Sequence, residues 1–387
     1  MSANVTPAGP ERSDFSPTID PPVAGDDAHP AVRGRMRRLC AAFPTDYFRS
    51  EDRHQGQAEA FAEALRTAGW CNALVSRAHG GLGLSLAEAC AAVEAIAIQG
   101  APAAGLVQEM CNHLLLVRHG DMLKDTYVRH VIGGTLRVPS MAIWSPGANA
   151  DVREIAQCTQ GVVVSGRKTR VSRVQNSDLL LLLVDGGTKH PGASLYLVDL
   201  RDAIGRGLWI EPCASLDTHD ASDLLIDKLL IPANHLVGEA GQGAAWIAQR
   251  RLPEMILSAA AATGDARWLL ARVSDLRPGS QNDSGEGWSP VLVKAWSAIE
   301  AANVMYARAA QRYDLLASCE GEARMALTLA LEAVSCAAQL AYRHPEALDQ
   351  DVDRKLRESR KHQVMPFATD LALAYISEHV LRIPRHQ

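Results

Sequence analysis

The sequence has no apolar segment long enough to cross a bilayer. Its longest purely apolar run, Leu179–Val184, is far shorter than the roughly 20 residues that a membrane-spanning helix needs. The N-terminus is polar and lacks a basic segment followed by an apolar one, the pattern that directs export. The net charge of −5 arises from dispersed acidic and basic residues, which offer no footprint for nucleic acid or an anionic membrane. We therefore expect a cytoplasmic protein with neither nucleic acid nor membrane as a partner.

Close cysteine pairs are also missing. The eight cysteines are scattered along the chain, which predicts neither a zinc knuckle nor a disulfide framework. Asp217, His219 and Asp220 carry possible metal ligands, but they fall in a predicted turn, where these residue types are common for backbone reasons. No metal site is predicted.

Local composition and the spacing of apolar residues divide the sequence into a leader and three domains. Residues 1–30 are rich in Pro, Ser, Asp and Gly, which is typical of a disordered leader. In residues 31–134 apolar side chains recur at helical spacing, which predicts an N-terminal helical domain. Residues 135–240 contain short β-branched or leucine-rich runs between turn residues, which predicts a middle β domain, either barrel or sandwich.

Alanine-rich helical periodicity returns in residues 241–387 and predicts a C-terminal domain that resembles a four-helix bundle. Within it, residues 277–287 cannot continue a helix and are expected to form a loop. The fold class is therefore α+β and multidomain, in the order helical, β, helical. That order alone does not name a reaction.

Four stretches make the chain resemble the acyl-CoA dehydrogenase family along nearly its whole length after the leader. They match the family's glycine turn, its Thr-Glu-Pro-x-Ala-Gly-Ser-Asp loop, its Gly-x-Lys-x-Trp-Ile-Thr segment and its Gly-x-Gly. In this chain they are His79–Leu84, Ile143–Asp151, Gly166–Ser172 and Gly241–Gly243. Each is weak alone, but their order and spacing are specific.

The resemblance implies an FAD-dependent oxidoreductase that acts on an acyl thioester of coenzyme A or of an acyl-carrier protein. In this family a carboxylate base removes the α-proton while the β-hydrogen leaves as a hydride to the flavin, giving a 2-enoyl thioester. The flavin lies between the β domain and the last helical domain, and the neighbouring subunit holds its adenine end. A homo-oligomer, dimer or tetramer, is therefore implied.

Two positions serve as the base in this family, and one of them is lost here. The commoner position falls on Pro366, which cannot accept a proton. The other falls on Glu254, next to Met255, which stands where the family has an Arg beside the thioester. The functional interpretation is a general base shielded in an apolar cleft. The alternative is an ordinary first-turn glutamate after Pro253, favoured by the helix dipole.

The resemblance assigns flavin and thioester contacts to the loop at the start of the β domain. Trp144 replaces a Thr that bonds the flavin ring. Ala150 replaces a Ser of the thioester and pyrophosphate region, and Asp151 is kept beside it. The residues that keep the shape of this loop are Pro146, Gly147 and Ala148.

Further flavin contacts are implied at the end of the next strand. Ser172 keeps a hydroxyl where the family's Thr bonds the ring. Arg170 replaces an aromatic side chain that packs on the ring. A guanidinium can also stack on a planar ring, whereas the alternative for Arg170 is a solvated charge at a strand end.

In this family a neighbouring subunit supplies part of the flavin site, and this sequence matches the motifs of that part poorly. The family's Arg-x-x-Phe-Gly falls in the insert from Arg277 to Glu286, which contains no Phe-Gly. The later Gly-Gly pair falls near Tyr342 and Arg343, whose side chains would block a close backbone approach. The alternative function is therefore a redox-inactive family member, either the non-catalytic subunit of a heteromeric dehydrogenase or a flavin-free protein that binds acyl thioesters.

Overall fold

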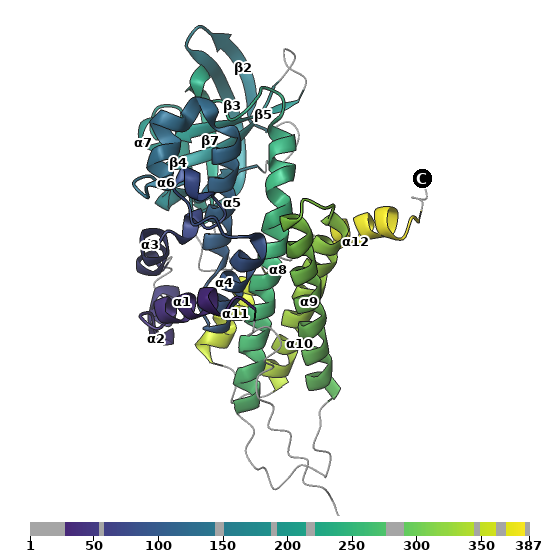
Figure 1. Ribbon diagram of the computed structural model, residues 1–387. Helices are drawn as coiled ribbons and strands as arrows, with labels where there is room; N and C mark the ends of the chain where they lie inside the picture. Colours follow the sequence, from purple (N-terminus) through teal and green to yellow (C-terminus); the bar gives the residue numbers. More distant parts are fainter. Residues whose placement is uncertain are drawn as a thin grey trace, which may run out of the picture.

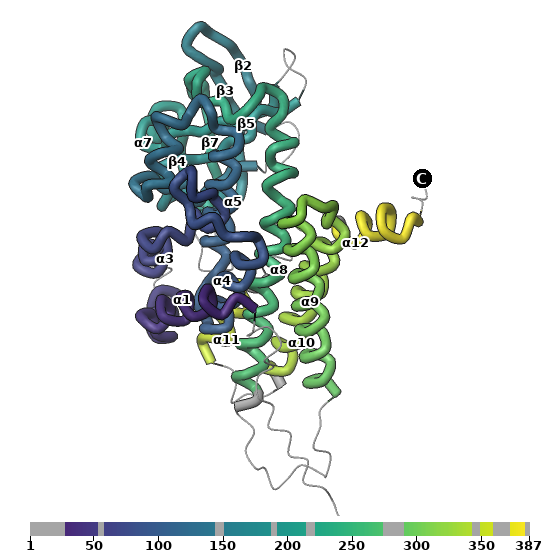
Figure 2. The backbone as a smooth tube through the Cα atoms, in the orientation of Figure 1, coloured from purple at the N-terminus to yellow at the C-terminus, as the bar shows by residue number. Residues whose placement is uncertain are grey.

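The computed structural model describes residues 28–53, 58–143, 151–186, 192–213, 221–275, 290–343, 349–360 and 369–383. N-terminal helices, a seven-stranded sheet and C-terminal helices follow one another along the chain (Figure 1). The long helix α8 runs from the sheet down through the helical parts (Figure 2). The predicted fold class is confirmed.

The N-terminal helices surround an apolar core that they share with α8. They are α1 (Pro30–Cys40), α2 (Thr45–Arg53), α3 (Glu59–Thr67), α4 (Leu86–Ile98), α5 (Ala104–His119) and α6 (Arg129–Ile132), with short turns η2 (Trp70–Asn72), η3 (Arg77–His79), η4 (Asp121–Leu123) and η5 (Lys124–Val128). The glycine turn before α4 requires Gly81, because a Cβ there would lie 2.1 Å from the Val75 carbonyl oxygen.

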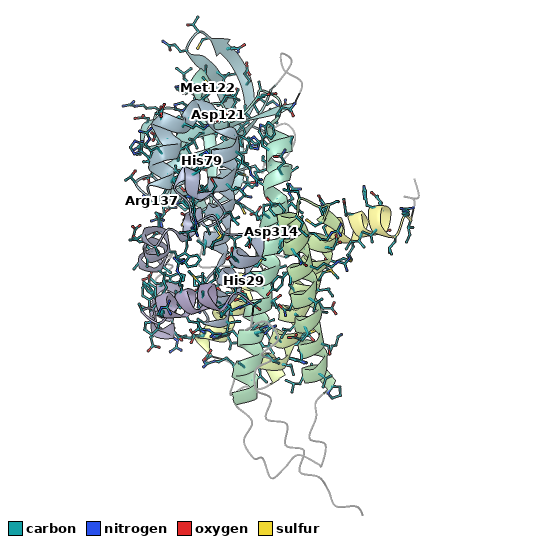
Figure 3. All side chains as sticks on the ribbon, in the orientation of Figure 1. His29, His79, Asp121, Met122, Arg137 and Asp314 are labelled. Carbon is teal, nitrogen blue, oxygen red and sulfur yellow. The ribbon has the colours of Figure 1, made fainter. Side chains whose placement is uncertain are left out.

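Two sets of hydrogen bonds stabilise the start of α4. Ser85 and Glu88 form a capping box, in which each side chain accepts from the other residue's backbone N–H. The Asp314 carboxylate then accepts from the backbone N–H groups of Leu86 and Ala87, at 2.7 and 3.1 Å. Figure 3 labels Asp314 where the end of α9 meets the N-terminal helices. The C-terminal bundle thus helps to hold the N-terminal domain.

The sheet has the strand order β1-β4-β2-β3-β7-β6, and β5 pairs with β4. Its strands are β1 (Ser140–Ala142), β2 (Arg153–Cys158), β3 (Gly161–Ser172), β4 (Leu179–Asp185), β5 (Ala193–Asp199), β6 (Leu208–Cys213) and β7 (Ala221–Pro232). The short helices η6 (Val174–Asn176) and α7 (Leu200–Ala203) lie between strands, and η7 (Ala233–His235) follows β7 on the way to α8. The residues on one face of β4 join the core of the β domain, and those on its other face join a core shared with α5 and α8.

The C-terminal helices are α8 (Gly243–Asp275), α9 (Pro290–Asp314), α10 (Glu320–Arg343), α11 (Gln350–Arg360) and α12 (Thr369–Tyr375), which continues as η10 (Ile376–Val380). Small residues let α8 cross α4 closely: a Cβ on Gly264 would lie 2.7 Å from the Ala97 Cβ. In Figures 1 and 2, α12 extends away from the bundle.

One helix in the described ranges, α10, is long and apolar enough to cross a membrane by length and composition. Of its most apolar window, 61% is buried inside the protein. Such burial is what a core helix shows, and one helix of this kind is weak evidence for a membrane span.

Burial makes His113 a pH-sensitive residue of the core. Its Nδ1 lies 2.6 Å from the Asn72 Oδ1, and the Asn72 amide nitrogen donates to the Ile132 carbonyl at 2.8 Å. The neutral ring therefore donates from Nδ1, and Nε2 makes no hydrogen bond within the described part of the chain. Desolvation lowers the pKa of His113 to about 4.

We expect the protein to lose stability as the pH falls from 6.5 towards 4. In this window the unfolded state binds a proton at His113 that the folded state does not, and at pH 5 this costs about 2 kcal/mol. Urea unfolding of the wild type and of His113→Asn at pH 7 and pH 5 checks this. Asparagine keeps a donor near Nδ1 and does not titrate, so its pH-dependent loss should be smaller by that amount; equal losses would contradict the assignment.

Candidate functional site

Glu254 lies in the interior of a helix. Because α8 begins at Gly243, the interpretation of Glu254 as a first-turn glutamate is wrong. Pro253 stands inside the helix, where it has no N–H to donate to the preceding turn. The Glu254 carboxylate is therefore held by tertiary contacts and not by a helix N-terminus.

The Glu254 side chain is only 10% exposed and is paired with Arg250, one turn earlier on α8. Arg250 is itself buried, and its Nε donates to the Asn112 Oδ1 of α5 at 2.7 Å. The Asn112 Nδ2 donates in turn to the Val138 carbonyl at 2.8 Å, just before β1. These contacts link Glu254 to the N-terminal helices and to the start of the β domain.

The surroundings of Glu254 combine an apolar wall with one strong polar partner. Met255, Ile256 and Leu257 are buried in the core shared by the helical domains. The carboxylate faces a guanidinium, which the sequence interpretation did not include. The Arg250 and Glu254 pair has the i, i+4 spacing of helical ion pairs, a signal from which it could have been found.

A small, partly open hollow lies beside this pair, between α5 and the first part of α8. The His119 ring stacks on Trp246 with ring centres 4.0 Å apart, at its edge. No carboxylate lines the hollow, and Arg250 is the member of the ion pair that reaches it. The lining residues are Cys111, Leu114, Leu115, Arg118, His119, Trp246, Gln249, Arg250 and Pro253.

At the end of β3, Arg170 and Ser172 differ in exposure. Arg170 is exposed at an irregularity in the pairing of β3 with β7, and its φ of 54° is in the left-handed region. Its backbone N–H donates to the Asp223 Oδ1 at 3.0 Å. Ser172 is half-buried, its carbonyl accepts from the Ser140 hydroxyl, and its own hydroxyl makes no bond among the described residues. At this strand end, the Ser172 hydroxyl and the exposed Arg170 guanidinium thus have no hydrogen-bond partner among the described residues.

Asp151 has a structural contact of its own. Its carboxylate accepts from the Lys168 ammonium at 2.6 Å and from the Val152 backbone N–H at 2.8 Å. Lys168 is fully buried and also donates to the Ile143 carbonyl at 3.1 Å. Desolvation lowers the pKa of Lys168, and Asp151 opposes that shift. Asp151 therefore fixes the start of β2 against β3.

Five residues assigned to the site lie outside the described residues: Trp144, Pro146, Gly147, Ala148 and Ala150. The insert assigned to the cross-subunit half-site, residues 277–287, lies outside them as well. Tyr342, near the position of the family's Gly-Gly pair, is 58% exposed at the end of α10.

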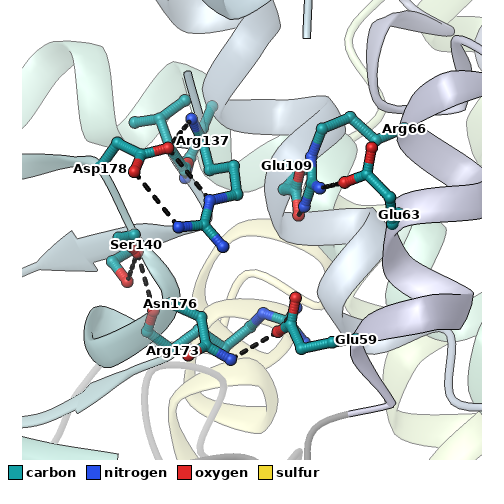
Figure 4. Close-up of polar contacts among 12 residues, drawn as sticks. Glu59, Glu63, Arg66, Glu109, Arg137, Ser140, Arg173, Asn176 and Asp178 are labelled. Atoms are coloured by element: carbon teal, nitrogen blue, oxygen red, sulfur yellow. Dashed lines mark hydrogen bonds and ion pairs between the residues drawn. The ribbon is translucent and has the colours of Figure 1, made fainter. Parts of the chain in front are cut away.

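A polar layer joins the N-terminal helices to the β domain near Arg137 (Figure 4). Arg137 is bound by Asp178 through its backbone N–H and through two guanidinium nitrogens, at 2.8 to 3.2 Å. Asn176 donates to Glu59 of α3, and the buried Arg173 lies near the same carboxylate. This layer fixes the backbone whose Val138 carbonyl holds Asn112.

The architecture now defines a class. A helical domain, a curled sheet and a helical bundle with a long first helix form the fold of the acyl-CoA dehydrogenases. Residues 26–135 match the family model described as the N-terminal domain of acyl-CoA dehydrogenase.

Named relatives support the same class. The acyl-CoA dehydrogenase FadE12 of Mycobacterium tuberculosis is 22% identical over 377 residues, covering 92% of this chain and 96% of that protein. The benzylmalonyl-CoA dehydrogenase of Aromatoleum aromaticum is 25% identical over 308 residues, covering 73% of this chain and 78% of that protein.

Solved structures agree in fold. PigA with FAD and proline superimposes with a TM-score of 0.82 at 18% identity, covering 95% of this chain and 99% of that chain. The glutaryl-coenzyme A dehydrogenase in its glutaryl-CoA complex gives 0.79 at 17% identity, covering 92% and 95%. The chain therefore contains a match to the N-terminal domain of the acyl-CoA dehydrogenases and shares the fold of these solved structures.

The described residues meet part of what a flavin needs. Ser172 offers an unbonded hydroxyl, and Arg170 offers an exposed guanidinium with aromatic-stacking capacity at the same strand end. Both are assigned to the ring by the resemblance. At these two positions the groups present are compatible with a flavin ring, and the exposure of Arg170 agrees equally with a solvated charge at a strand end.

Proposed function

We propose that this chain catalyses α,β-dehydrogenation of an acyl thioester with FAD, and that Glu254 is the base. The observation that carries the proposal is a carboxylate buried inside α8, where family resemblance expects the base. Burial keeps water from the carboxylate, as proton abstraction from a weakly acidic carbon requires.

Bound FAD would supply a hydride acceptor for the β-hydrogen. On this chain Ser172 would bond the edge of the ring, and Arg170 would cover its face. We further propose that Trp144, Pro146, Gly147 and Ala148 complete this side of the cofactor site, as the resemblance implies.

Glu254 would form an O–H bond with the α-proton as the Cα–H bond breaks. Met255, Ala150 and Asp151 are proposed to contact the acyl thioester. Met255 is 2% exposed and so would act as an apolar wall, whereas Asp151 is held in place by Lys168. Chain length and branching of the acyl group are left open by these contacts.

A partner subunit is part of the proposal, either a second copy or a related dehydrogenase subunit. Apolar side chains are exposed on α9 and on the C-terminal segment that projects in Figure 1, namely Val293, Val304, Leu373, Val380 and Leu381. Covering such side chains is favourable, and a partner subunit would do so.

The absorption spectrum of the protein with FAD tests the proposal. We expect a yellow protein whose flavin band bleaches when a saturated acyl-CoA is added without oxygen, with a 2-enoyl thioester as product. A panel of straight, branched and dicarboxylic acyl-CoAs, and one acyl-carrier-protein thioester, covers the open substrate choice. Bound flavin that no thioester of the panel bleaches would contradict the proposal.

One observation favours a second candidate, a redox-inactive subunit or a flavin-free thioester-binding protein. The Glu254 carboxylate is engaged by Arg250 and does not itself line the neighbouring hollow. A protein that stays colourless with FAD yet binds acyl-CoA, or that becomes yellow only with a related subunit, would support this candidate.

A further inference from the structure

Three parts of the chain converge on the Glu254 carboxylate through one pair of side chains. Arg250 is 5% exposed and binds Glu254 through one terminal nitrogen. Its Nε donates to Asn112 of α5 at 2.7 Å. Asn112 is fully buried and donates to the Val138 carbonyl at 2.8 Å. The C-terminal helices, the N-terminal helices and the approach to β1 therefore meet at this point.

The geometry of these bonds is restrictive. The planar guanidinium donates in fixed directions, so the Asn112 bond orients Arg250 and with it the bond to Glu254. Asn112 cannot rotate without losing either the Val138 carbonyl or the Arg250 Nε. The orientation of the acid group is thus determined by the junction of the three domains and not by α8 alone.

The charged and titratable groups near Glu254 come from α8 and α5. Arg250 faces Glu254 from its own helix. From α5, Cys111 interacts electrostatically with Arg250, Glu254 and Arg118, and burial raises the pKa of the Cys111 thiol to about 12, so it stays neutral at pH 7. Among the described residues, the Arg250 guanidinium is therefore the charged group bonded to the Glu254 carboxylate.

We propose that Arg250 and Asn112 are positioning residues that hold the Glu254 carboxylate in the orientation needed for proton abstraction, with Arg250 as its counter-charge. This inference rests on the proposed function, because it assigns Arg250 a part in the same site. Neither residue contacts the substrate in this proposal. Each acts through Glu254.

Substitution of Arg250 tests the inference. In Arg250→Gln we expect flavin reduction by acyl-CoA to slow by about 10²-fold, because a misplaced catalytic group costs this much. The acid limb of the pH–rate profile should move to higher pH, because the opposite charge is gone. The apparent affinity for acyl-CoA should change little. Arg250→Lys keeps the positive charge, so its pH–rate profile should be that of the wild type. Lysine cannot donate to Asn112 and Glu254 in the fixed directions of a guanidinium, so only part of the rate should return.

Asn112→Leu and Arg251→Gln separate orientation from charge. Asn112→Leu removes the acceptor that orients Arg250, so we expect a slower reaction with an unmoved acid limb. Arg251 is adjacent on α8, is half-buried and has no ion pair within the described ranges, so Arg251→Gln is the matched control and should leave both rate and profile unchanged. If Arg250→Gln keeps the wild-type profile, or behaves like Arg251→Gln, the inference is overturned.

A measurement that needs no turnover separates this inference from the proposed function. With ¹³C at the glutamate side-chain carboxyl, the resonance absent from Glu254→Gln reports the Glu254 protonation state. It should titrate at higher pH in Arg250→Gln than in the wild type. If the flavin of the wild type does not bleach but this shift is present, the proposed function is wrong and the Arg250–Glu254 contact is supported. If the flavin bleaches and no shift occurs, the inference is wrong and the proposed function is unaffected.

Discussion

Flavin reduction in Glu254→Gln is expected to be slower than in the wild type by about 10²- to 10⁴-fold. Glutamine keeps the size of the side chain and can still accept a hydrogen bond from Arg250, but it cannot take up the α-proton. Substrate binding should persist, because the thioester contacts are proposed for other residues. Stopped-flow absorbance of the FAD-loaded protein, mixed with the best acyl-CoA of the panel, measures the rate.

Glu332→Gln is the matched control for this substitution. Glu332 is an exposed glutamate on α10, so its replacement should leave the rate of flavin reduction unchanged. Both variants should bind FAD as the wild type does and unfold at a similar urea concentration. Undiminished flavin reduction in Glu254→Gln would remove Glu254 from the mechanism.

The second large effect is expected at Glu94, a buried carboxylate between two arginines. Glu94 is 0% exposed; its Oε2 accepts from Arg33 of α1 at 2.6 Å, and its Oε1 lies 3.4 Å from the Arg267 Nε of α8. Glu94→Gln would leave the Arg33 guanidinium buried without its counter-charge. We expect the free energy of unfolding to fall by about 3–5 kcal/mol, the usual effect of removing one partner of a buried ion pair.

Urea unfolding measures this loss, with Glu239→Gln, an exposed glutamate, as the control. A triple variant refines the test: Arg33→Met with Glu94→Leu and Arg267→Met removes all three charges together. Because buried ion pairs can be replaced by apolar side chains at little cost, this variant should regain most of the lost stability. If Glu94→Gln is as stable as the wild type, the expected role of Glu94 as the counter-charge of Arg33 and Arg267 is contradicted.

The sheet was predictable where burial is complete. Leu179–Val184 is an uninterrupted apolar run because β4 is covered on both faces: Leu180 and Leu182 join the β-domain core, while Leu179 and Leu181 join the core shared with the helices. Strands β2 and β6 are partly or largely exposed and carry mixed polar residues, so no apolar run marks them in the sequence.

Helix α11 shows that a highly charged helix can carry buried side chains. Its sequence is almost entirely polar, yet Arg354 and Lys355 are buried. They donate to the carbonyls of Gly100 and Ala101, and Lys355 pairs with Asp265 at 2.6 Å. Glu358 on the same helix pairs with both cations, but the carbonyls and the Asp265 carboxylate that accept from them inside the protein lie more than eighty residues away in the chain.

The candidate site was predicted only in part. The resemblance assigned Glu254, but the start of its helix was misjudged, because Pro253 was interpreted as a helix start although α8 continues through it. Arg250 follows the local i, i+4 spacing and could have been found. Asn112 could not, because its role depends on the way α5 crosses α8 and on the position of the Val138 carbonyl.

A crystal structure of the FAD-loaded protein with an acyl-CoA analogue that cannot be oxidised tests the central claim most directly. We predict a Glu254 carboxylate oxygen about 3–3.5 Å from the α-carbon of the analogue, the distance of a near-attack arrangement. The acyl group should lie between that carboxylate and the flavin ring, with Arg250 still bound to Asn112. An analogue bound elsewhere, with Glu254 turned away from it, would contradict the account.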